Sequence, residues 1–85
     1  MQHDIKVERF TYDIMRGLKM PIVVIYYSPS DYPGIFIARL FDLEQGTRYI
    51  MQAELIQELR ERLPAHLTRS PRTDEDPGAI VETWF

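Results

Sequence analysis

The sequence predicts a small α+β domain: an antiparallel sheet in the order β-β-β-α-β, with one amphipathic helix packed on one face. Two observations predict it. Apolar runs at Ile22–Tyr27 and Ile35–Leu43 flank a turn-rich stretch at Ser28–Gly34, as in a β-hairpin. Farther along, Glu54–Leu63 has the apolar spacing of a helix, and a closing strand follows it. A strand that follows such a helix usually returns to the same sheet.

The first twenty residues follow neither period cleanly. Apolar and charged residues alternate at Ile5–Val7 as in a strand, whereas a helical spacing of apolar residues starts at Phe10. We expect a strand-like or irregular start and a short helical turn near Tyr12–Leu18. We therefore separate an N-terminal arm, residues 1–20, from a single α+β domain, residues 21–85.

The hairpin prediction depends on residue type. The first run consists of β-branched and aromatic residues, which strands favour. The stretch between the runs holds two prolines, which fix φ, and Gly34, which permits a positive φ. After the second run we expect a turn at Glu44–Thr47 and a short third strand at Arg48–Met51.

The helix prediction rests on one apolar stripe, formed by Leu55, Ile56, Leu59 and Leu63. Pro64 disfavours helical geometry at the residue before it and ends the helix. We expect Thr68–Gly78 to be a polar loop and Ala79–Phe85 to be the closing strand.

Both hairpin strands are apolar on both faces, so one helix cannot cover them. Small Ala38 permits close approach, and we therefore place the helix on the face of Phe36, Ala38 and Leu40. The opposite face carries Ile35, Ile37, Arg39 and Phe41. Three large apolar side chains left in water would forgo about 1.5–3 kcal/mol each. We expect the arm or another chain to cover them.

Arg39 stands in the middle of that second face. Its guanidinium must reach solvent or a carboxylate, for which Asp42, Glu82 or a partner's acid are the candidates. The alternative is an arginine whose stem lies along the sheet while its head reaches water.

Composition excludes several classes of protein. No cysteine is present, which excludes a disulfide scaffold, a thiolate zinc site and a cysteine nucleophile. A net charge of −3 disfavours direct nucleic-acid binding. The start lacks the pattern of a signal peptide, and no apolar run is long enough to span a membrane. We expect a cytoplasmic protein without membrane attachment.

No catalytic, cofactor or metal motif is present. His3 and His66 are the only histidines, and His66 has no carboxylate beside it at the spacing of a metal ligand. Asp74–Asp76 lacks the glycine-punctuated spacing of a calcium loop. Ser28 and Ser30 have no nearby base to activate them. We therefore predict no catalytic residue, no cofactor, no metal and no enzyme activity.

The order of elements resembles the HicB-like antitoxin domain, a small partial ribonuclease-H-like fold. The matching pieces are Ile22–Tyr27, Tyr32–Ala38, Gly46-Thr47, Glu54–Leu63 and Ile80–Trp84. The resemblance implies an antitoxin whose acidic surface neutralises a basic, RNA-acting toxin. After the second strand this chain has Phe41–Gly46 in place of the family's Pro-Asp-Leu-Pro-Gly-Cys. An uncharacterised bacterial small-protein family is the other assignment that this order allows.

The leading functional hypothesis is a non-enzymatic protein–protein interaction module, which self-associates as a homodimer or binds a protein partner. The predicted interaction surface consists of Ile35, Ile37, Arg39, Phe41 and Tyr32. The alternative is a small-ligand or catalytic pocket between Arg39 and the turn that Tyr26 and Tyr32 flank.

Overall fold

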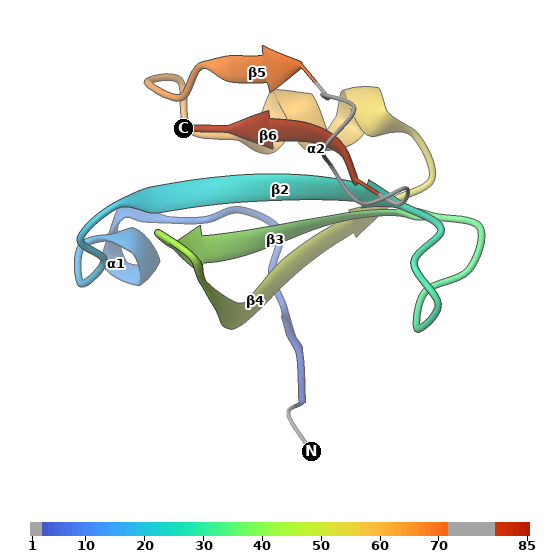
Figure 1. Ribbon diagram of the computed structural model, residues 1–85, viewed down its shortest axis with the longest axis horizontal. Helices are drawn as coiled ribbons and strands as arrows, with labels where there is room; N and C mark the ends of the chain where they lie inside the picture. Colours follow the sequence, from blue (N-terminus) through green and yellow to red (C-terminus); the bar gives the residue numbers. More distant parts are fainter. Residues whose placement is uncertain (1–2, 72–79) are drawn as a thin grey trace.

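A central hairpin organises the structure, as the sequence predicts. In the computed structural model, which describes residues 3–71 and 80–85, β2 (Pro21–Tyr27) pairs antiparallel with β3 (Phe36–Asp42). The pairing runs without interruption from Pro21 opposite Asp42 to Tyr27 opposite Phe36. Figure 1 shows the two strands side by side at the centre of the molecule.

The complete sheet is mixed and has six strands in the order β1-β4-β3-β2-β6-β5. The remaining elements are β1 (Ile5–Lys6), α1 (Tyr12–Met15), β4 (Gln45–Ala53), α2 (Ile56–Arg62), β5 (Arg69–Pro71) and β6 (Ile80–Trp84). The α+β class is therefore confirmed. The predicted antiparallel order β-β-β-α-β is wrong in its details, because two short strands and a first helix are added to it.

The two added strands lie at the outer edges of the sheet. β1 runs parallel to β4, with Ile5 opposite Tyr49, and this single parallel pairing makes the sheet mixed. β5 lies within Thr68–Gly78, which the sequence predicts to be a loop, and it pairs with β6. A proline is tolerated at an edge, where one side of the strand needs no donor. Residues 72–78 of that predicted loop lie outside the described residues.

The third strand is longer than predicted. β4 begins at Gln45, because a loop of only two residues, Leu43 and Glu44, joins it to β3. Leu43 has a φ of 59°, in the left-handed region that a leucine rarely adopts. The predicted turn at Glu44–Thr47 is therefore one residue too late at its start and falls mostly within the strand.

The helix α2 covers the predicted face of the hairpin. Leu59 of α2 is fully buried against a core that includes Ala38 and Leu40 of β3 and Val23 and Ile25 of β2. Phe36 packs against the same core. The prediction that the helix lies over Phe36, Ala38 and Leu40 is confirmed.

Residues before β2 also contribute to this core. Phe10 and Met15 are buried with Leu59, Leu63 and Leu67. The helical turn α1 is shorter than the predicted Tyr12–Leu18, and the side chain of Thr11 caps its start. The division into an arm and a domain stays a prediction, which a truncation experiment can test.

Neither helix in the described ranges, 3–71 and 80–85, combines the length and the apolar character that crossing a membrane requires.

Candidate functional site

Arg39 lies on the sheet face opposite α2 and is held by the N-terminal segment. Its cross-strand neighbours are Val24 on β2 and Ile50 on β4, both of which are buried. Its Nη1 donates to Oδ1 of Asp4 at 2.9 Å and to the carbonyl oxygen of Thr47 at 3.0 Å. The carboxylate that Arg39 reaches is thus neither Asp42 nor Glu82, the candidates that sequence reasoning named.

Asp4 also binds Tyr32, so three segments far apart in the sequence meet at one carboxylate. The Tyr32 hydroxyl donates to Oδ2 of Asp4 at 2.8 Å. The hydrogen bond from Arg39 lowers the pKa of the Asp4 carboxyl below its usual value. The bond to Asp4 raises the pKa of the Tyr32 hydroxyl. We name Tyr32, Asp4 and Arg39 the Asp4 bridge.

Two small hollows open beside the Asp4 bridge. The larger, of about 280 Å³, is lined by Asp4, Asp31, Arg39, Gly46 and Thr47. The smaller, of about 120 Å³, shares Arg39 and Asp31 and adds Tyr26, Pro29, Tyr32 and Ile37. In the larger hollow two carboxylates outnumber the one guanidinium, so this hollow does not favour an anion. Both hollows offer polar recognition, and no histidine lines either of them.

The five residues of the predicted interaction surface differ in their burial and in their contacts. Ile37 is only 2% exposed in the single chain, so its burial does not require a second chain. The β2–β3 loop, through Pro29 and Tyr32, lies beside it. Arg39 and Tyr32 are brought together by Asp4. Ile35 and Phe41 are partly buried. The role of these five residues in an interaction stays a prediction.

A second apolar group lies on the same face, where the hairpin strands begin and end. Ile22 and Phe41 are cross-strand partners there. Met20 directly precedes β2 and Leu43 directly follows β3, and the Leu43 amide donates to the Met20 carbonyl oxygen at 2.9 Å. Met20 is 50% exposed and Leu43 is 56% exposed. We name Met20, Ile22, Phe41 and Leu43 the hairpin-base patch.

On the opposite face, Glu82 is a buried charge with a structural role. Arg60 of α2 donates to both of its carboxylate oxygens, and Trp84 Nε1 donates to Oε1 at 3.0 Å. Arg69 of β5 adds a contact of 3.4 Å. Burial by itself would raise the pKa of the Glu82 carboxyl, but the bonds from Arg60 and Trp84 outweigh it and lower the pKa. This cluster ties α2 and β5 to β6.

Sequence reasoning missed Asp4 and Met20, and it placed Leu43 at the end of the second strand without including it in the interaction surface. A lone arginine within an apolar strand signals that some carboxylate must meet it, but no spacing rule points to an acid 35 residues earlier.

The described residues contain no group of three His, Asp or Glu side chains that could hold a metal ion. Asp74–Asp76, the acidic stretch considered above, lies outside them. Comparison with protein-family models, with curated proteins and with solved structures finds no match to this chain. The resemblance to the HicB-like antitoxin domain therefore stays a prediction.

Proposed function

We propose that this chain is a non-enzymatic protein-interaction module that self-associates through the hairpin-base patch. The observation that carries the proposal is Leu43. Its side chain is mostly in water and its φ is 59°, so neither burial nor backbone preference explains a leucine at this position. An unfavourable residue that the fold does not need is often retained for function.

The neighbours of Leu43 supply a contact surface of suitable chemistry. Phe41 lies across Gly46 of β4, where an added Cβ would meet the phenyl ring at 3.4 Å, so the ring lies close against that strand. Covering Met20 and Leu43 would gain about 1.5–3 kcal/mol for each side chain that becomes fully buried. Four apolar residues are too few for a whole interface of at least about 1,000 Å², but they fit its buried centre.

A substitution at Leu43 separates association from folding. Asn tolerates the left-handed conformation better than Leu, so Leu43→Asn removes the apolar side chain and relieves the backbone at once. We expect sedimentation velocity over a dilution series to show a dimer for the wild-type chain. For Leu43→Asn we expect the dissociation constant to rise at least about tenfold. The thermal midpoint, compared at a concentration where both proteins are monomeric, should stay the same or rise.

Leu55→Asn is the matched control. Leu55 is 62% exposed, close to the 56% of Leu43, but it is the N-cap residue of α2 and does not belong to the patch. This control is expected to dimerise like the wild type. A wild-type chain that stays monomeric at millimolar concentration would refute self-association, and equal weakening by both substitutions would refute the assignment to the patch.

A second candidate function is a small-ligand site at the Asp4 bridge, and the two hollows beside Arg39 favour it. Two carboxylates and one guanidinium suit a ligand that carries both a cationic and an acidic group, such as a free amino acid. Titration with a panel of free amino acids, followed by the amide resonances of Thr47 and Asp31, tests this candidate. Unchanged resonances at millimolar ligand would rule it out.

A further inference from the structure

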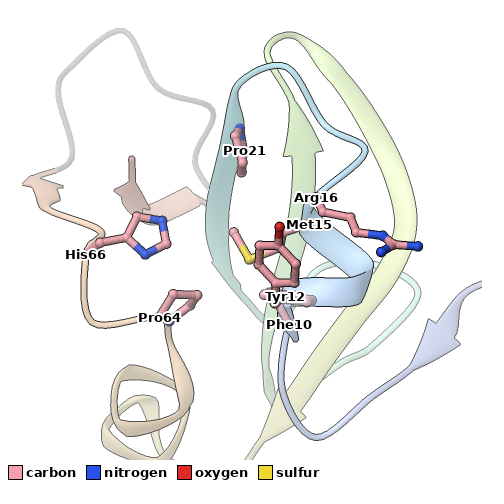
Figure 2. Close-up of a pocket in the computed structure, with 7 residues that line it drawn as sticks. All are labelled: Phe10, Tyr12, Met15, Arg16, Pro21, Pro64 and His66. Carbon is pink, nitrogen blue, oxygen red and sulfur yellow. The ribbon is translucent and has the colours of Figure 1, made fainter.

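An apolar groove of about 410 Å³ opens between α1 and the segment that follows α2. Figure 2 shows Pro64 and His66 on one side of it and Tyr12 and Met15 on the other. Phe10 and Pro21 complete the apolar part of the lining. The groove belongs to the α2 side of the sheet, since Phe10 and Met15 are members of that core. It is therefore separate from both the hairpin-base patch and the Asp4 bridge.

The walls of the groove are fixed by backbone contacts. On one side, the Met15 amide donates to the Thr11 carbonyl oxygen at 3.0 Å. On the other side, the Leu67 amide donates to the Pro64 carbonyl oxygen at 3.2 Å. Two prolines in the lining have fixed φ angles, which limits collapse of the groove. A preformed apolar groove of this volume falls in the range of small-molecule sites.

The polar groups of the groove select an electron-rich ligand group. Among the residues that the structure describes, two basic ones, Arg16 and His66, belong to the lining, and no acidic one does. This balance contrasts with the net charge of −3 of the whole chain. The His66 ring points into the gap in Figure 2, and a histidine ring carries at least one N–H donor in either protonation state.

Arg16 adds positive charge at the rim of the groove. Its guanidinium points away from the gap in Figure 2, and its contact with Asp13 is long, at 3.9 Å, between two exposed side chains. Such a pair contributes little to stability, so the positive charge of Arg16 can still attract an anionic ligand. The charge pattern of the groove thus complements an anion, while its apolar lining complements a hydrocarbon or aryl body.

We propose that this groove binds a small amphipathic carboxylate. The apolar body lies between the Met15 and Pro64 walls, and the carboxylate accepts a hydrogen bond from the His66 ring. If each non-hydrogen atom takes roughly 30 Å³, the volume of one water molecule in the liquid, the groove of about 410 Å³ holds about a dozen such atoms. That size suits a medium-chain or aryl carboxylic acid rather than a long lipid chain.

Paired ligands and paired variants test the proposal. Sodium octanoate is the probe, and 1-octanol is its uncharged counterpart of equal chain length; binding is followed by the amide resonances of Met15, Arg16 and His66. We expect octanoate to bind with a submillimolar dissociation constant and octanol about fivefold more weakly, because a carboxylate accepts a stronger hydrogen bond than a neutral hydroxyl does. His66→Phe keeps an aromatic ring and removes the donor, so it should weaken octanoate about fivefold and octanol, which accepts only a neutral hydrogen bond, by less.

His3→Phe is the matched control, because His3 is exposed and is not among the residues that line the groove. It should bind both ligands as the wild type does. Equal affinities for octanoate and octanol, or resonance changes confined to Met20 and Leu43, would overturn the proposal. Octanoate affinity that falls as protein concentration rises would also overturn it, because a second copy would then occupy the groove. Repeating the titration on the Leu43→Asn variant, in which we expect the dimer to be weakened, separates ligand binding from self-association.

Discussion

At the scale of single residues, the sheet holds one partly buried charge centre on each face. On one face Asp4 binds Arg39, and on the other Glu82 binds Arg60. In both cases the acid comes from near an end of the chain and the arginine from a central element. A buried charge without its partner is costly, so each centre fixes how a terminal segment must pack.

Glu82→Gln tests the stabilising role of the second centre. At pH 7 we expect the free energy of unfolding to fall by about 2 kcal/mol, because charged hydrogen bonds to Arg60 and Trp84 become neutral or are lost. Urea unfolding monitored by circular dichroism measures this change.

The difference in stability between the wild type and Glu82→Gln should depend on pH. The pKa of the Glu82 carboxyl is lowered on folding, so its stabilising contribution is complete above its ordinary value of 4.5 and is lost as the pH falls through the folded pKa. The difference between wild type and Glu82→Gln should therefore shrink below about pH 4.5. The titration of Asp4 occurs in both proteins and cancels. A difference that stays constant down to pH 2 would contradict this account.

At the scale of elements, α2 begins without a capping side chain. Leu55 occupies the N-cap position in an extended conformation, and its side chain makes no cap hydrogen bond. Glu58 stands three residues later, where a capping box places its acidic member. The sequence thus holds half of a capping box.

Leu55→Ser should complete that box and stabilise the protein. A serine hydroxyl can accept from the Glu58 amide, and the glutamate can reach back to the amide of the N-cap residue. We expect a gain of about 1 kcal/mol, which raises the thermal midpoint by roughly 4–8 °C in a domain of this size. Leu55→Ala, which cannot cap, is the comparison, and a similar rise for alanine would show that capping is not the cause.

The elements that the sequence predicts are those with local signals. The hairpin is marked by β-branched runs around a turn rich in proline, and α2 is marked by an apolar stripe that Pro64 ends. β1 and β5 have two and three residues, and they are strands only because the edges of β4 and β6 lie beside them. Pairing of that kind depends on the assembled sheet. The alternation at Ile5–Val7 indicates a strand but not its partner, and no local pattern predicts β5.

At the scale of the whole molecule, the same limit applies to the candidate sites. Sequence reasoning selected Arg39 and Tyr32 from their residue types and their positions in and beside a strand, but it did not identify the carboxylate that joins them. It also treated the face of Ile37 as one apolar surface. The structure divides that face, because the β2–β3 loop and Asp4 cover one end and leave the hairpin-base patch at the other.

Two truncations test whether the first twenty residues belong to the core. A chain that begins at residue 8 loses β1 and Asp4, and we expect it to unfold cooperatively with a loss of about 1–3 kcal/mol. A chain that begins at residue 21 also loses Phe10 and Met15, which are 3% and 8% exposed. Large-to-small changes at such sites cost about 2–5 kcal/mol each, which approaches the stability of an ordinary small domain.

We therefore expect the chain of residues 21–85 to show no cooperative thermal transition by far-ultraviolet circular dichroism. The chain that begins at residue 8 is the internal control, since it undergoes the same kind of shortening but keeps both buried side chains. A sharp transition for residues 21–85 within a few degrees of the full chain would contradict this expectation. That result would show instead that residues 1–20 are an arm attached to an independent domain, because the sheet and α2 would then be stable without Phe10 and Met15.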